Sequence, residues 1–175
     1  MPELATFDGA ALIAALDAQR ADRALDWAAL ADVLYGQSHE LNAELADNCL
    51  CSGALVRTAK RGTMSCQYAL ILLRWIGQAP EDFLTGSVNH VGDTTLPDAG
   101  PDRRLRFDLP SLYAALNQER RARGHTWAGL ADVLACTPAR LTNLRTARLA
   151  DMGLTVSVTQ WLTRPAADFV HTTRW

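Results

Sequence analysis

The sequence predicts an all-α fold made of two tandem five-helix copies, with an extra short helix inserted into the first. Two observations predict it. Short phrases recur along the chain at constant spacing, and each recurrence combines apolar residues at helical spacing with capping residues in front of them. The 175 residues are 49% hydrophobic and 21% charged, which is enough apolar material for one ordinary core or two small ones.

The two copies are related by two spacings. The phrase WAALADVL at residues 27–34 recurs as WAGLADVL at 127–134, an offset of 100 residues. Further along, Trp75 corresponds to Trp161, and there the offset is 86. The first copy therefore carries 14 extra residues, which must fall within residues 35–50.

These spacings divide the chain into a first copy at residues 1–86, a linker at 87–105 and a second copy at 106–175. The phrase TGSVNHVGDTTLPDAGPDRR between the copies is rich in Gly, Pro, Asp and Thr and has no apolar periodicity. Such a composition is typical of a linker.

The insertion at about residues 35–50 predicts a short acidic helix. In SHELNAELAD, Ser38 is a possible cap, Leu41 and Leu45 lie four residues apart, and Glu40 and Glu44 fall on the opposite side. We expect this helix to lengthen the turn that precedes the third helix of the first copy.

Capping residues place the helices of the second copy. Asp108 and Thr126 stand where they can accept hydrogen bonds from the first turns of two helices, and Gly124 ends the first of these. The phrase MGLTVSVTQWLT at 152–163 is rich in Val and Thr, so propensity alone would allow a strand. Its match to ALILLRW in the first copy favours a helix.

The phrase TWAGLADVLACTPARLTNLR at 126–145 predicts two helices joined by a tight turn. Ala131 is the small residue needed at the inner corner of a steep crossing, and Thr137 caps the second helix. Four leucines at helical spacing point to a shared core: Leu130, Leu134, Leu141 and Leu144.

With these features, each copy resembles the repressor/Cro-like (Xre-type) helix-turn-helix proteins, whose fold is that of the lambda repressor. The resemblance extends from the first helix to the fourth. The sequence departs from the family at Ala135, where glycine is common in the turn, and at Trp127, where a glutamine often reaches a phosphate.

The resemblance implies that the helix starting at Pro138 reads the DNA major groove. With the leucines inward, Asn143 can bond an adenine edge, and Thr142 or Ala139 can touch a thymine methyl group. The arginines around them would hold phosphates, or would simply form a solvated face. The DNA-binding residues expected in the second copy are Thr137, Ala139, Arg140, Thr142, Asn143, Arg145, Thr146 and Arg148.

Charge differs sharply between the two halves. Residues 1–100 contain 6 basic and 13 acidic residues, a net charge of −7, whereas residues 101–175 contain 11 and 6, a net charge of +5. Duplex affinity depends largely on Lys and Arg, so the second copy is the better DNA-facing module. Arg103, Arg104 and Arg106 in front of it form either a basic arm or merely a soluble segment.

The first copy gives conflicting signals. Arg57 and Lys60 occupy the positions of Asn143 and Thr146, with Arg61 beside them. Either this copy binds DNA in an altered pose, with Arg57 reaching a guanine or a phosphate, or it is a docking surface for its sister copy, a second chain or another protein. The cationic residues favour DNA contact, and the acidic insertion favours docking.

No enzyme, cofactor or metal site is expected. The sequence has no glycine-rich phosphate loop and no nucleophile with a plausible base. The cysteines lack C-x-x-C spacing and are expected to be small buried residues, although redox sensing by Cys49, Cys51 or Cys66 is left open. No apolar run is long enough for a membrane helix and no secretory signal is evident, so we expect a cytoplasmic protein.

The leading hypothesis is a bacterial transcriptional regulator that binds double-stranded DNA. Its two fused copies would imitate the dimer that single-domain relatives form, and would read adjacent half-sites. The alternative is a protein-interaction adaptor that keeps the fold and uses the acidic first domain to bind a partner or a second copy of the chain. The overall pI of about 6.0 favours this alternative.

Overall fold

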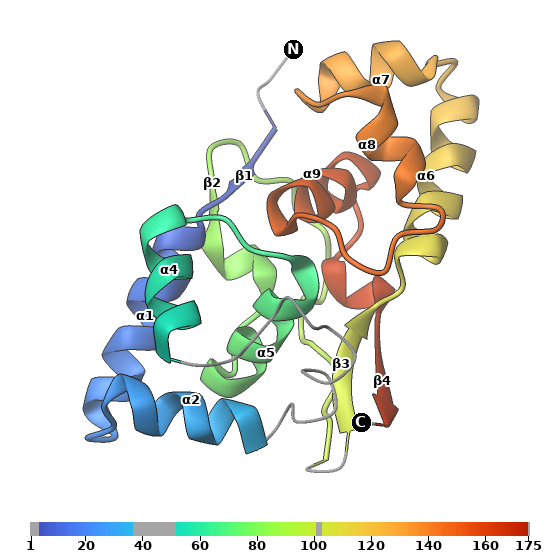
Figure 1. Ribbon diagram of the computed structural model, residues 1–175. Helices are drawn as coiled ribbons and strands as arrows, with labels where there is room; N and C mark the ends of the chain where they lie inside the picture. Colours follow the sequence, from blue (N-terminus) through green and yellow to red (C-terminus); the bar gives the residue numbers. More distant parts are fainter. Residues whose placement is uncertain (1–3, 37–51, 101–102, 175) are drawn as a thin grey trace.

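The computed structural model describes residues 4–36, 52–100 and 103–174. The first copy comprises β1 (Thr6–Phe7), α1 (Gly9–Asp22), α2 (Trp27–Gly36), α4 (Ser52–Arg61), α5 (Cys66–Ile76), the 3-10 helix η1 (Pro80–Phe83) and β2 (Leu84–Thr85) (Figure 1). The second comprises β3 (Arg103–Phe107), α6 (Leu109–Ala122), α7 (Trp127–Val133), α8 (Pro138–Asn143), α9 (Met152–Leu162), the 3-10 helix η2 (Ala166–Phe169) and β4 (Val170–Arg174). The acidic helix expected from Ser38, with Glu40 and Glu44, lies outside the described residues.

The repeat seen in the sequence is also present in the elements. Helix α6 begins and ends 100 residues after α1, and α9 begins and ends 86 residues after α5. Turn η2 follows η1 by the same 86 residues. Asp108 caps α6 as predicted, and Asp8 caps α1 in the same way, since each accepts a hydrogen bond of 2.9 Å from the backbone N–H three residues later.

The prediction of an all-α fold is wrong, because the ends of each copy pair as short antiparallel strands. Strand β1 pairs with β2, with Phe7 opposite Leu84, and β3 pairs with β4, with Phe107 opposite Val170. The β-branched residues of VHTTR favour extended backbone. In place of the fifth helix expected in each copy there is a single 3-10 turn.

Strand β3 also gives the arginines before the second copy a different role. Arg103 and Arg106 lie in the paired strand, and Arg104 between them is buried. These residues therefore belong to a sheet rather than to a free basic arm.

The centre of the molecule is formed by α5 and α9, which pack against each other. Every residue of α5 except Arg74 is buried, and most of α9 is buried too. The phrase at 152–163 is thus helical, as the repeat predicted. Helix α5 also contacts β3 of the second copy, and α9 contacts β1 of the first. Both copies therefore share one hydrophobic core.

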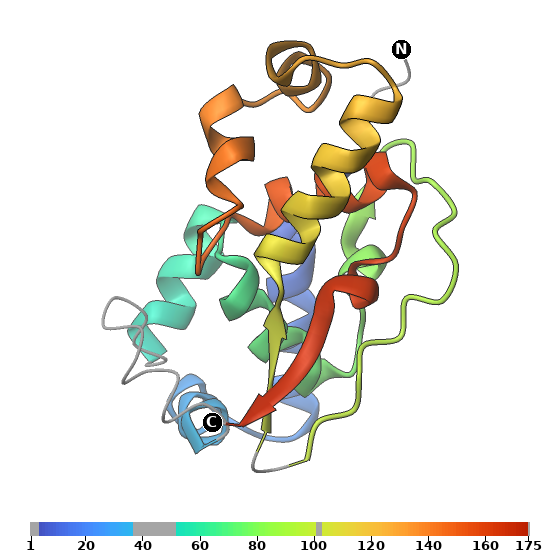
Figure 2. The same ribbon diagram turned by 90° about the vertical axis from the view of Figure 1, so that its right-hand side faces the viewer.

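A reciprocal pair of backbone hydrogen bonds joins the two copies at the N-terminal ends of the two central helices, α5 and α9. The Cys66 N–H donates to the carbonyl of Ala150 at 2.8 Å, and the Met152 N–H donates to the carbonyl of Met64 at 2.9 Å. The two segments run antiparallel. With the offset of 86, Cys66 corresponds to Met152 and Met64 to Ala150, so each hydrogen bond repeats the other with the two copies interchanged. Such reciprocity defines an approximate two-fold axis. Accordingly, α2 and α7 lie at opposite ends of the molecule (Figures 1 and 2).

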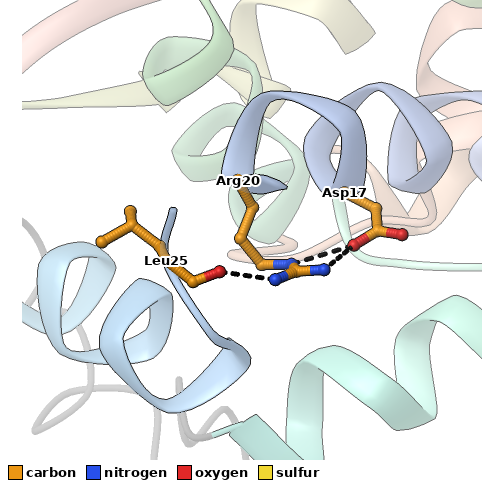
Figure 3. A network of polar contacts seen from close by, with 3 residues as sticks. All are labelled: Asp17, Arg20 and Leu25. Carbon is orange, nitrogen blue, oxygen red and sulfur yellow. Dashed lines mark hydrogen bonds and ion pairs between the residues drawn. The ribbon is translucent and has the colours of Figure 1, made fainter. Parts of the chain in front are cut away.

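Equivalent arginines brace the corner between the first two helices of each copy. Arg20 on α1 donates to Asp17 and to the carbonyl of Leu25 (Figure 3). Its counterpart Arg120 donates to Asn117 and to the carbonyl of His125. The two guanidinium groups also stack over the corresponding tryptophans, Trp27 and Trp127, at 4.8 and 4.5 Å from the ring centres. The duplication therefore includes side-chain contacts that the sequence repeat alone did not reveal.

Candidate nucleic-acid interface

Helices α7 and α8 form the tight helical pair that the sequence predicted. Ala131 is buried at the corner, and Thr126 accepts a hydrogen bond of 3.0 Å from the N–H of Gly129. Thr137 caps α8 through a longer bond of 3.4 Å from the N–H of Arg140. The four predicted core leucines are all buried: Leu130, Leu134, Leu141 and Leu144.

The turn between α7 and α8 explains why glycine suits the position of Ala135. This alanine has a φ of 49°, in the left-handed region, where a Cβ atom crowds the backbone. The next residue, Cys136, closes the turn by donating its N–H to the carbonyl of Ala131 at 2.9 Å. Ala135 thus adopts the backbone that glycine would adopt, at a cost in strain.

The outward side of α8 carries the residues that helical spacing predicted there. Ala139 and Asn143 are exposed, and so is Thr146 just beyond the helix end. Thr142 is half-buried, and its hydroxyl lies within hydrogen-bond distance of the carbonyl oxygens of Pro138 and Ala139, at 3.2 and 3.3 Å. The hydroxyl of Thr142 is therefore occupied within the helix.

Three arginines surround this side of α8. Arg140, Arg145 and Arg148 are all exposed. Arg140 lies 3.7 Å from Asp151, the residue that caps α9. Among the described residues, Arg145 and Arg148 make no ion pair. Their charges are accordingly available to a ligand.

Helix α4 presents the matching surface of the first copy. Leu55, the counterpart of Leu141, is buried, whereas Arg57, Lys60 and Arg61 are exposed. Val56 beside them is 36% exposed, which is unusual for a large apolar side chain. This helix thus combines three cations with an apolar contact point.

Helices α4 and α8 lie on the same side of the molecule. Figure 2 shows both along one edge, with the segment that connects the copies along the opposite edge. Between them lies a shallow depression, lined in pseudo-two-fold fashion by residues 63–65 and 149–151. No acidic residue occurs within 52–65 or 138–150, and the one acidic residue that lines the depression, Asp151, pairs with Arg140. We call this side the cationic face, and its six cations are Arg57, Lys60, Arg61, Arg140, Arg145 and Arg148.

The connection between the copies is held away from the cationic face. Arg74 of α5 donates to the carbonyls of Ala99 and Gly100 at 2.7 and 2.9 Å. Burial lowers the pKa of Arg74, and the charge of the nearby Asp98 opposes this effect. At the equivalent position of α9, Gln160 accepts from the N–H of Asn89 at 2.9 Å. The two central helices therefore fix both ends of the connection.

Glu81 is a polar residue at the contact between the copies that sequence reasoning missed. Glu81 of η1 accepts a hydrogen bond of 2.6 Å from the N–H of Ala166, at the start of η2. Burial raises the pKa of this carboxyl group, and Asp82 raises it further. Nothing in the local sequence marks Glu81, because its partner lies 85 residues away.

The cysteines show no sign of a metal centre in the described parts of the chain. Cys66 is buried, and burial raises the pKa of its thiol. Cys136 is partly buried, and its pKa is raised for the same reason. No cluster of three or more possible ligands occurs among the described residues. Cys49 and Cys51 lie outside them.

Within the same residues, no helix has the length and apolar character needed to cross a membrane. Comparison with known protein families, with curated proteins and with solved structures found no match to this chain.

Proposed function

We propose that this protein is a cytoplasmic, non-enzymatic regulator of transcription that binds double-stranded DNA through its cationic face. In this proposal each copy is a helix-turn-helix unit of the repressor/Cro-like kind. Helices α4 and α8 enter successive major grooves on one side of the duplex, as the two halves of a dimer would. The chain is thus a bacterial regulator that carries both halves of such a dimer.

The observation that carries this proposal is the reciprocal contact between the segments at Cys66 and Met152. An approximate two-fold axis through this contact relates α4 to α8 and leaves both exposed on one side. The two antiparallel backbones of a duplex are also related by two-fold axes, which are perpendicular to the duplex axis. Two protein helices related by such an axis can therefore meet two equivalent grooves.

Electrostatics supports the same assignment. The chain as a whole has a net charge of −2, yet the cationic face carries six basic side chains and no acid within either helix. Each Lys or Arg that neutralises a phosphate releases condensed counterions, which drives duplex binding at low salt. A protein with a net negative charge that nevertheless carries six basic side chains on one face is therefore suited to bind a polyanion there.

The second candidate is a protein-interaction adaptor. It is favoured by the net charge of −7 in residues 1–100, which would suit a basic protein partner or self-association. In that case the exposed cations of α4 and α8 would be solvated surface charges.

Fluorescence anisotropy with a labelled duplex of mixed sequence separates the two candidates. DNA binding through the cationic face predicts an affinity that falls by several decades between about 50 and 200 mM salt. The substitutions Arg145→Ala and Lys60→Ala should each lower the slope of log K against log salt by about 0.9.

Arg121→Ala is the matched control, because Arg121 is an exposed arginine on α6 and belongs to neither α4 nor α8. Its slope should equal that of the unmodified protein. Equal effects of all three substitutions would contradict the proposed face. Absence of duplex affinity at low salt, with helicity intact by circular dichroism, would leave the adaptor as the better candidate.

A further inference from the structure

Equivalent positions on α4 and α8 carry different chemistry. The approximate two-fold axis relates each residue of α4 to the residue 86 positions later, which lies in α8 or directly after it. Arg57 thereby corresponds to Asn143, and both are exposed. Among the described residues, neither makes an ion pair. Two side chains at equivalent exposed positions therefore carry different hydrogen-bonding groups.

These two groups match different bases. An arginine donates two parallel hydrogen bonds to O6 and N7 of guanine, whereas an asparagine pairs with N6 and N7 of adenine. Both patterns occur only in the major groove. Arg57 therefore favours a guanine where Asn143 favours an adenine.

The neighbouring pair of equivalent residues, Val56 and Thr142, does not add to the difference in base preference. Val56 offers methyl groups to the outside, and its counterpart Thr142 has its hydroxyl occupied by the carbonyls of Pro138 and Ala139. Both side chains thus offer an apolar contact, which suits a thymine methyl group. The distinction between the two helices rests on Arg57 and Asn143.

Building on the proposed function, we propose that the protein recognises a non-palindromic duplex site and binds it in one orientation. One half of the site carries a guanine opposite Arg57, and the other half carries an adenine opposite Asn143. A symmetric homodimer cannot make this distinction, because its two reading helices are identical. The duplicated chain removes that constraint.

Selection of binding sequences from a randomised duplex library, with the full chain, tests this proposal. The expected motif has two unlike halves. Exchanging the guanine of one half for adenine should weaken binding by about 5- to 100-fold. Asn143→Arg should change the second half so that it also prefers guanine, and the selected site should become more nearly palindromic.

Arg57→Asn is the reciprocal variant and should make the site palindromic in adenine. Arg57→Lys keeps the charge but loses the rigid paired donors, so it should retain affinity for mixed-sequence DNA and weaken the guanine preference. Circular dichroism checks that each variant is folded, which we expect for substitutions at exposed positions.

Salt-dependent binding with a palindromic motif, or with no base preference, would overturn this inference and leave the proposed function standing. The same holds if Arg57→Lys and Arg57→Asn leave the selected motif unchanged, because Arg57 would then contact only phosphate. Absence of duplex binding at low salt would overturn both this inference and the proposed function.

Discussion

The first and second copies share a skeleton but differ in the residues that this skeleton exposes. Arg20 and Arg120 make the same contacts to a tryptophan and to a turn carbonyl, although their other partners are an aspartate and an asparagine. In contrast, the exposed positions of α4 differ in residue type from the equivalent positions of α8 and the residues directly after it. Packing therefore constrains the two copies alike, whereas the exposed face leaves each copy free to acquire its own chemistry.

Backbone conformation gives a second contrast. Gly124 has a φ of 70°, and at the equivalent position Ala24 has a φ of 54°. After the central helices, Gly77 has a φ of 70° and Thr163 a φ of 56°. The fold thus requires a left-handed residue at both positions in both copies, and each copy uses glycine at only one of them. The other residue carries strain.

The largest effect is expected from truncating the buried leucines of α4 and α8, which tests whether the two helices are packed equally firmly. Leu55 and Leu141 are equivalent and fully buried, so Leu55→Ala and Leu141→Ala should each lower the free energy of unfolding by about 2 to 5 kcal/mol. Chemical denaturation measures both. The matched control Val56→Ala, at an exposed position, should change stability by less than about 0.5 kcal/mol. A small effect at Leu55 alone would break the equivalence of the two helices.

The next effect concerns the left-handed positions at the end of the first helix of each copy. Gly124→Ala should lower the free energy of unfolding by about 1 kcal/mol, because a Cβ atom is unfavourable at that φ. Open space surrounds the position, so no steric clash contributes. Ala24→Gly should raise stability by a similar amount. Thermal denaturation of both variants measures this, and shifts of the same sign would contradict the account.

The smallest effect concerns the contact between η1 and η2. The pKa of Glu81 is raised in the folded protein, so the folded state binds this proton more tightly than the unfolded chain does. The resulting stability is present below the unfolded-state pKa and is lost as pH rises through the folded-state pKa. As pH rises above the ordinary titration range of a carboxyl group, the free energy of unfolding of the unmodified protein should therefore fall relative to that of Glu81→Gln.

Denaturant titrations at several pH values compare the two proteins. Curves that stay parallel across these pH values would show that Glu81 is as well solvated in the folded state as in the unfolded chain. A difference that grows towards high pH supports its burial between the copies.

The helices could be predicted from local sequence because their signals are local. Asp108, Thr126 and Thr137 each cap a helix within three residues of themselves, and the repeat separated a helix from a strand at 152–163. The strands could not be predicted in this way, because Phe7 pairs with Leu84 and no nearby pattern marks that partner. Pairing across such distances depends on how the whole copy closes.

The arrangement of the candidate site was also only partly predictable. Helical spacing placed Asn143, Arg145 and Thr146 outward, and all three are exposed. The relation between α4 and α8 depends instead on backbone hydrogen bonds at Cys66 and Met152, which leave no side-chain signature. Spacing along the chain shows that the copies exist, but it does not show how they dock.

A hydroxyl-radical footprint on a selected duplex tests most directly whether α4 and α8 share one face of the DNA. At saturating protein we predict two protected patches on the same side of the duplex, about one helical turn apart. Arg57→Ala with Lys60→Ala should weaken one patch, and Asn143→Ala with Arg145→Ala should weaken the other. A single patch, or two patches that both depend on α8 alone, would contradict the account.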